Sequence, residues 1–288
     1  MTMRRRDFVA LILTHGRPDK VRTLAMLKKS GYTGPIIIVV DNEDKTKEEY
    51  QRTYGRSVVV FDKMAVAECI DEGDNFKDRR AIIYARNASF EIAKNAGYKY
   101  FIELDDDYNY AEWRFTNKHT YCSGKRVRCL DGVFDAMVNF LEAAQCDSVA
   151  IAQGGDFIGG RNGKFGSKIF ASRKAMNTFV CCVDRPFEFF GRINEDVNTY
   201  TCGQRRGLVF LTFNRLSITQ TQTQKNSGGM TEMYIDSGTY VKSFYSVMYA
   251  PSCVSIAMMG DKHRRIHHRV SWEHTAPKIV RESLVKTL

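Results

Sequence analysis

Three consecutive carboxylates, Asp105, Asp106 and Asp107, follow an apolar and aromatic run that begins at Tyr98. The run predicts a buried strand, and open α/β sheets bind ligands at the carboxyl ends of their strands. Side chains at positions i and i+2 of an extended segment point the same way, so we expect Asp105 and Asp107 to face one ion. These oxygen ligands suit a hard divalent cation that holds a diphosphate. The alternative is an acidic surface turn after a strand.

A helix is predicted immediately before this strand, over residues 79–97, because apolar residues recur there at helical spacing and Gly97 suits its end. Arg86 and Asn87 lie on this helix. An Ala-Arg-Asn helix, a Gly-Tyr turn and a strand ending in Leu-Asp-Asp-Asp therefore follow one another. This ordered unit resembles the centre of nucleotide-sugar glycosyltransferases with the glycosyltransferase A fold.

The resemblance extends back to two earlier predicted strands, residues 7–14 and 36–40. The second is a continuous β-branched run, typical of a parallel strand covered on both faces. In the family, the loop after the first strand and an acidic residue after the second hold the nucleoside, commonly uridine. The resemblance thus implies that Thr14 and Asp41 contact the base. The alternative for Asp41 is the N-cap of a helix over residues 45–54.

The family match also assigns residues to the rest of the donor. It implies that Arg17 or Arg86 contacts the ribose-diphosphate and that Asp106 belongs to the donor-binding residues. A UDP-sugar is then the donor substrate.

A Glu-Asp pair, Glu195 and Asp196, follows an aromatic and glycine-containing stretch over residues 189–194. It resembles the Glu-Asp motif of inverting family members. Transfer with inversion needs one general base, because the acceptor hydroxyl must lose its proton as the new bond forms. We assign this role to Asp196 and a supporting or acceptor-binding role to Glu195. The alternative is that both only favour a helix N-terminus through its dipole.

Residues 262–269 hold three of the six histidines. Family members often complete the metal shell with a histidine from this part of the chain, so His267 and His268 are candidate ligands. Adjacent side chains of an extended segment point to opposite faces, so we expect only one of them to bind. One imidazole with carboxylate oxygens suits Mn²⁺ or Mg²⁺ rather than zinc. A basic surface cluster that binds phosphates is the alternative.

Strand and helix patterns alternate over residues 7–151, which predicts an α/β fold with a mostly parallel central sheet flanked by helices. We expect a glycosyltransferase A-type core over residues 1–225, with a donor half over about 1–110 and an acceptor half over about 111–225. Residues 226–288 would close the fold and complete the active site.

Two long polar connections, residues 108–128 and 220–233, predict binding loops. Residues 277–288 predict a closing helix.

The 288-residue chain has no run that approaches a transmembrane span, and its basic start has no signal-peptide cleavage site. The eight cysteines form no Cys-x-x-Cys and suggest neither a zinc ribbon nor a disulfide framework. We therefore expect a cytoplasmic protein without membrane insertion, located in the host cytoplasm if a phage encodes it. The oligomeric state is not predicted.

The net charge of +10 predicts a polyanionic partner, such as nucleic acid, an anionic glycan or a membrane surface. The His-Gly-Arg-Pro start, the Leu-Asp-Asp-Asp centre and the C-terminal His-His-Arg run resemble phage glycosyltransferases that modify hydroxymethylated pyrimidines in DNA, including the TET-associated group. This implies inverting transfer to 5-hydroxymethylcytosine or a related base in DNA.

Three alternatives stay open. A glycosyltransferase with a surface polysaccharide, lipid or protein acceptor would share every donor motif. A metal-dependent nucleotidyltransferase would also use paired aspartates, although the sequence has no Walker-type phosphate loop. A noncatalytic nucleic-acid-binding protein would need only the charge.

Overall fold

The computed structural model describes residues 5–74, 79–220, 230–259 and 264–275, with side chains throughout except at 230–237 and 239. The strands are β1 (Phe8–Leu13), β2 (Ile36–Asp41), β3 (Val58–Phe61), β4 (Tyr100–Asp105), β5 (Tyr108–Phe115), β6 (Tyr121–Arg126), β7 (Ser148–Gln153), β8 (Ala171–Ser172), β9 (Thr178–Cys182), β10 (Phe210–Gln220), β11 (Val254–Met259) and β12 (Arg265–Val270). The α-helices are α1 (Arg22–Lys29), α2 (Lys47–Tyr54), α3 (Lys63–Ala67), α4 (Ile83–Asn95), α5 (Leu130–Ala143), α6 (Glu195–Arg205), α7 (Met230–Tyr249) and α8 (Trp272–Thr275), and the 3-10 turns are η1 (Pro18–Lys20), η2 (Gly55–Ser57), η3 (Gly154–Phe157) and η4 (Gly160–Asn162).

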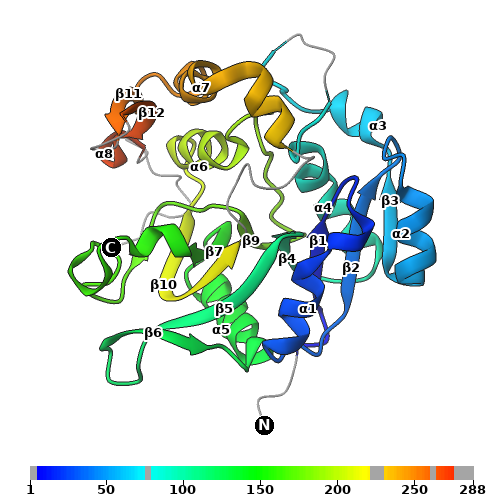
Figure 1. Cartoon of the computed structure of the whole chain (residues 1–288), viewed down its shortest axis with the longest axis horizontal. Helices are drawn as coiled ribbons and strands as arrows, with labels where there is room; N and C mark the ends of the chain where they lie inside the picture. Colours follow the sequence, from blue (N-terminus) through cyan, green and yellow to red (C-terminus); the bar gives the residue numbers. More distant parts are fainter. Residues whose placement is uncertain (1–4, 75–78, 221–229, 260–263, 276–288) are drawn as a thin grey trace, which may run out of the picture.

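One large sheet forms the centre of the molecule, with strand order β3-β2-β1-β4-β9-β7-β10-β5-β6 and β8 paired to β10 (Figure 1). The ladders β3–β2, β2–β1, β1–β4 and β7–β10 are parallel. Strand β9 is antiparallel to both β4 and β7, so β7 and β10 run in the same direction as β4. The carboxyl ends of β1, β2, β4, β7 and β10 consequently share one edge of the sheet.

Two apolar cores cover the two faces of this sheet, because its central strands are hydrophobic on both sides. One core packs α1, α2 and α5 against alternate residues of β1 and β4, such as Ile12 and Leu104. The other packs α3, α4 and α6 against the residues between them, such as Leu11 and Phe101. This three-layer arrangement confirms the expected α/β class with a mostly parallel sheet.

The second half of the sheet differs from the sequence prediction in two places. Strand β9, which lies between β4 and β7, was not predicted. Residues 108–128, expected as a binding loop, form the hairpin of β5 and β6, and β5 is held in the large sheet by its antiparallel pairing with β10. The expected loop at 220–233 and closing helix at 277–288 fall mostly or entirely outside the described residues.

The last described elements form a separate layer beyond α6. Strands β11 and β12 make a two-stranded antiparallel sheet beside α7, which is kinked at Gly238 (Figure 1). Among the described helices, none is long and apolar enough to cross a membrane.

Gly191, in the segment before α6, has both a left-handed backbone conformation and too little space for a side chain. Its φ is +74°, and a Cβ atom there would lie 2.7 Å from Tyr249, 2.8 Å from Asn198 and 2.8 Å from Tyr245. Gly97, after α4, has φ of +82°, but a Cβ atom there would meet no other atom within 4 Å. A side chain at Gly97 would therefore cause backbone strain alone, whereas one at Gly191 would cause both backbone strain and steric overlap.

We expect Gly97→Ala to lower the free energy of unfolding by about 1–2 kcal/mol, the cost of a left-handed residue with a Cβ. Gly191→Ala should cost about 1–3 kcal/mol more, because overpacking adds to the same strain. Urea unfolding of both variants measures the difference. Equal losses would mean that the tyrosines yield to the added methyl group without cost.

Candidate active site

The acidic strand end lies where the sequence predicted it, at the carboxyl edge of the sheet. Asp105 ends β4 directly beside Leu13, the last residue of β1, so the loop after β1 meets the three carboxylates. Asp106 is buried, whereas Asp105 and Asp107 are partly exposed. Asp105 and Asp107 interact electrostatically, which places both carboxylates in one small region.

A buried guanidinium lies beneath this strand end. Arg86 on α4 is 1% exposed and its three nitrogens reach three carboxylates: Glu103 at 3.3 Å, Asp105 at 3.2 Å and Glu195 at 3.1 Å. The rings of Phe179 and Phe189 flank the same guanidinium. Buried charges require such pairing, because desolvation without a partner is costly.

This geometry changes the role that we expected for Arg86. Each nitrogen of the buried guanidinium is already engaged by a carboxylate, so the expected contact with a ribose-diphosphate is not met in this structure. Arg86 instead joins β4 to the first turn of α6, which are far apart in the chain. The signal missed in the sequence is Glu103, whose carboxylate in an otherwise apolar strand requires a buried cation.

The charge balance around Arg86 favours an additional cation. Burial raises the pKa of Asp105, Arg86 opposes this shift, and Asp107 and Glu195 raise the pKa further. Burial and then the charge of Asp106 raise the pKa of Asp107 to about 6. Two neighbouring oxygen donors in an excess of negative charge fit a hard divalent cation.

Asp106, expected at the donor, is instead part of a hydrogen-bond chain that fixes the loop after β1. The backbone N–H of Arg17 donates to the hydroxyl of Tyr50 at 2.9 Å, and that hydroxyl lies 2.7 Å from Thr14 Oγ1. Thr14 Oγ1 donates to Asp106 Oδ2 at 2.6 Å, so Tyr50 must donate to Thr14. The Arg17 guanidinium donates to Asp106 Oδ1 at 2.8 Å.

The Asp106 carboxylate is 1% exposed and both of its oxygens are occupied within the protein, so its role at the donor stays a prediction. The Thr14 hydroxyl is likewise engaged within the protein. Arg17 remains at the surface of the cluster, with 20% of its side chain exposed. Hydrogen bonds thus fix the loop after β1 to the acidic end of β4.

Asp41, at the end of β2, is paired with the imidazole of His15 and the ammonium of Lys63. His15 Nδ1 lies 2.6 Å from Asp41 Oδ2, and Lys63 Nζ lies 3.3 Å from Oδ1. The hydrogen bond to Asp41 raises the pKa of His15, although burial opposes it. The alternative role of Asp41 as a helix N-cap is wrong, because α2 is preceded by Thr46. His15 is half exposed and adds a group to which the sequence assigned no role.

Glu195 and Asp196 lie in the first turn of α6, as the dipole alternative also required. Both are buried, but their partners differ: Glu195 pairs with Arg86, whereas Asp196 Oδ1 accepts the backbone N–H of Val197 at 2.8 Å. Burial raises the pKa of Asp196 to about 6 and Glu195 adds to the rise, while Val197 N–H, Arg86 and Lys174 oppose it. Such a pKa suits a general base near neutral pH.

The segment that leads into α6 is held from two sides. Asn87 on α4 bonds both the N–H and the carbonyl of Phe189, at 2.9 and 3.1 Å. Asn194, in the left-handed conformation, donates to the carbonyl of Lys242 and to Ser246 on α7. The position of Asp196 therefore depends on both helices.

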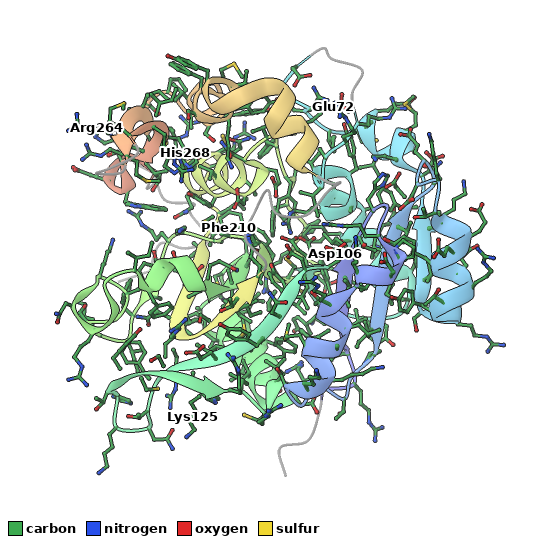
Figure 2. All side chains as sticks on the ribbon, viewed as in Figure 1. Glu72, Asp106, Lys125, Phe210, Arg264 and His268 are labelled. Atoms are coloured by element: carbon green, nitrogen blue, oxygen red, sulfur yellow. The ribbon has the colours of Figure 1, made fainter. Side chains whose placement is uncertain are left out.

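His267 and His268 do not join the acidic strand end. They lie on β12, and Figure 2 shows His268 well apart from Asp106. Their ring centroids are 4.2 Å apart, so the two rings do not point to opposite faces as expected. Within the described ranges, no three His, Cys, Asp or Glu side chains are placed to hold a metal ion. The structure does not bring either histidine to the aspartates of β4, so the histidine ligand stays a prediction.

The surroundings of the two histidines are cationic. Burial and the neighbouring His267 lower the pKa of His268 to about 4, and Lys242 and Lys174 act in the same direction. Lys242 and Lys174 also act on Asp196. This positive region therefore borders the Glu-Asp pair rather than the aspartates of β4.

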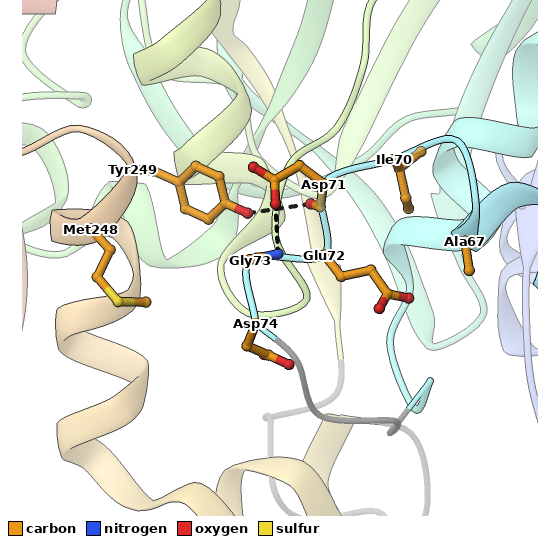
Figure 3. Close-up of a pocket in the computed structure, with 8 residues that line it drawn as sticks. All are labelled: Ala67, Ile70, Asp71, Glu72, Gly73, Asp74, Met248 and Tyr249. Carbon is orange, nitrogen blue, oxygen red and sulfur yellow. Dashed lines mark hydrogen bonds between the residues drawn. The ribbon is translucent and has the colours of Figure 1, made fainter.

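A pocket of about 610 Å³ lies between residues 67–74 and the end of α7, lined on one side by Met248 and Tyr249 (Figure 3). Tyr249 donates to the carbonyl of Asp71, and Arg192 pairs with Asp74 across the same region. Its acidic lining disfavours a diphosphate, and it contains none of the predicted site residues.

We expect Tyr50→Phe to lower the free energy of unfolding by about 1–3 kcal/mol, because it leaves the part-buried Arg17 N–H without its acceptor and the buried Thr14 hydroxyl without its donor. Tyr240→Phe is the matched control, since Tyr240 is 71% exposed, and it should change stability by less than about 0.5 kcal/mol. Chemical denaturation measures both. A Tyr50→Phe variant as stable as the control would show that the hydrogen-bond chain does not fix the first loop.

Comparison with known proteins identifies the family. A family model described as TET-Associated Glycosyltransferase matches residues 8–229, whereas no curated protein matches the chain. Similar solved structures include TarS 1-349 of S. aureus (13% identity, 75% of this chain and 60% of that chain, TM-score 0.42) and full-length S. aureus TarS, of which the chain spans 37% (11% identity, 76% of this chain, TM-score 0.42). Another is glucosyl-3-phosphoglycerate synthase from Mycobacterium tuberculosis in complex with Mn²⁺, UDP-glucose and phosphoglyceric acid (11% identity, 93% of this chain and 88% of that chain, TM-score 0.43). Because the family model covers most of the chain, the protein belongs to the TET-associated glycosyltransferase family, which confirms the resemblance to that group stated from the sequence.

Proposed function

We propose that this protein is a metal-dependent inverting glycosyltransferase that moves a sugar from a UDP-sugar to the hydroxyl of 5-hydroxymethylcytosine, or a related hydroxymethylpyrimidine, in DNA. The observation that carries the proposal is the junction at Arg86, which holds a diphosphate-side carboxylate, Asp105, and the Glu-Asp pair of α6 in one site. Family membership supports the reaction class, and the family's association with TET supports the DNA acceptor.

In this proposal the protein supplies a base and a fixed geometry. The carboxylate of Asp196 takes the proton of the acceptor hydroxyl while its oxygen forms the bond to the anomeric carbon. The bond from that carbon to the diphosphate oxygen breaks, and UDP leaves with the electron pair. Attack from the face opposite UDP inverts the anomeric centre.

Asp105 and Asp107 would hold a Mn²⁺ or Mg²⁺ ion, which would offset the charge that develops on the leaving diphosphate. Arg86 and Glu195 have a positioning role, because their ion pairs connect these aspartates to α6. His15 and Arg17, on the first loop, are polar groups that follow Thr14 closely in the chain and reach solvent, with 47% and 20% of their side chains exposed.

The direct test is mass spectrometry of nucleosides from hydroxymethylcytosine duplex DNA incubated with the protein, Mn²⁺ and a panel of UDP-sugars. The proposal requires a new nucleoside heavier by one sugar residue with at least one donor. Transfer only to a polysaccharide, lipid or protein acceptor would replace the DNA acceptor by that alternative. Incorporation of a nucleotide with release of pyrophosphate would favour the nucleotidyltransferase.

Asp196→Asn should lower kcat by roughly 10²-fold or more while UDP binding stays near normal, because it removes only the base. For the unmodified protein, kcat should fall as pH drops through about 6, since protonated Asp196 cannot accept a proton. Asp184→Asn, at a carboxylate with 67% of its side chain exposed, is the control and should retain full turnover. Lost UDP affinity with unchanged turnover in Asp196→Asn would assign the residue to the donor instead.

Asp107→Asn should abolish UDP-stimulated Mn²⁺ binding and turnover while the protein stays folded, because a site with few ligands loses one of them. Isothermal titration with Mn²⁺ in the presence of UDP, together with circular dichroism, measures both. Full turnover of the unmodified protein in EDTA would contradict metal dependence.

A further inference from the structure

The net charge of the protein is concentrated in two segments. Residues 113–130 and 157–183 each contain five Lys or Arg and no Asp or Glu. The whole chain has 43 Lys and Arg against 33 Asp and Glu, so the rest of the molecule is balanced and these segments account for the excess of +10. A surplus of this size in two short stretches indicates a surface for a polyanion.

A small aromatic core packs the two segments against each other. Phe115 and Tyr121 of the β5–β6 hairpin are in ring contact, and Tyr121 contacts Phe157, whose ring is 6.0 Å from that of Phe165. The guanidinium of Arg114 lies 4.7 Å from the centre of the Phe157 ring. The hairpin and the loop after β7 therefore form one body, here called the basic platform (residues 113–128 and 157–174).

The charged side chains of the basic platform are presented to solvent. Seven of its basic residues are exposed: Lys118, Lys125, Arg126, Arg128, Arg161, Lys164 and Lys168. The two carboxylates that flank the platform are already neutralised, Glu112 by Arg114 and Arg126, and Asp156 by Lys174. Figure 2 shows Lys125 on the hairpin, directed away from the body of the sheet.

The basic platform is continuous with the candidate active site. Its loop begins after β7, whose carboxyl end shares the sheet edge with that of β4. At the other end of the loop, Gln204 of α6, the helix that begins with Glu195 and Asp196, donates to the carbonyl of Arg173 at 2.6 Å. A long polyanion bound on the platform would thus reach the proposed base.

We propose that the basic platform binds the phosphate backbone of duplex DNA and so delivers the acceptor base to Asp196, an inference that rests on the proposed function. Lysine and arginine heads on a rigid body suit sequence-independent phosphate contacts, which position a duplex without reading its sequence. The regular spacing of duplex phosphates favours DNA over a membrane surface, because the charges follow an elongated hairpin and loop rather than an amphipathic helix.

The test compares two triple variants of the full chain with equal loss of charge. One is Lys125→Ala, Arg161→Ala and Lys164→Ala on the platform. The control is Lys45→Ala, Arg52→Ala and Arg56→Ala, all exposed and beside β3, at the opposite end of the sheet order from β6 (Figure 1). Fluorescence anisotropy with hydroxymethylcytosine duplex across 50–200 mM salt gives the slope of log K against log salt.

The platform variant should lose up to about 2.7 from the magnitude of that slope, since each phosphate contact contributes about 0.9, and its KM for the duplex should rise at least about tenfold at 100 mM salt. UDP binding and the control variant should be unchanged. Equal slopes and KM values in both variants would overturn the platform while leaving the proposed function intact.

Two further outcomes are distinct. If the platform variant lost binding to phosphatidylglycerol vesicles but kept that to DNA, the platform would be a membrane or glycan surface instead. If the unmodified protein transferred no sugar to any hydroxymethylated DNA, the proposed function itself would fail, whatever the variants showed.

Discussion

The buried guanidinium of Arg86 is the interaction on which the rest of the site depends. It faces three carboxylates from two elements: Glu103 and Asp105 of β4 and Glu195 of α6. Burial is the main reason why the pKa of Asp105 is raised despite its ion pair with Arg86, and the neighbouring charges of Asp107 and Glu195 raise it further. A cation added at the exposed side of this cluster would therefore stabilise the charged form of its carboxylates.

This junction also determines where chemistry can occur. Helix α4 carries Arg86 and Asn87 on successive positions, so one residue binds the acidic strand and α6, and the next fixes Phe189 before α6. The helix therefore sets the distance between a carboxylate suited to a cation, Asp105, and one suited to act as a base, Asp196. Two successive residues of one helix would thus fix the position of Asp105 relative to Asp196.

The sequence predicted the elements better than their partners. The β-branched run of β2 and the apolar run of β4 identified parallel strands, because burial on both faces leaves a local pattern. The hairpin of β5 and β6 was missed, since neither strand has an alternating apolar pattern and β5 is positioned by its pairing with β10. Arg86 was placed on the right helix, but sequence does not reveal that Glu103 and Glu195 converge on it. His267 and His268 were proposed as metal ligands from the family resemblance, whereas pairing of β12 with β11 places them in a separate sheet. Asp106 was predicted at the strand end, but its engagement by Thr14 and Arg17 depends on tertiary contacts.

A double-mutant cycle between Arg86 and Glu195 tests the central claim most directly, that one buried ion pair joins the acidic strand to α6. The free energy of unfolding in urea would be measured for Arg86→Met, Glu195→Gln and the double variant. Removing Arg86 alone should cost about 3–5 kcal/mol, since it leaves buried carboxylates without a partner. The double variant should lose less than the sum of the single variants by at least about 1 kcal/mol, because the two residues are in contact. Should Arg86→Met fail to fold, Arg86→Lys takes its place in the cycle. Losses that add within about 0.5 kcal/mol would show that the two residues act independently and would contradict the claim.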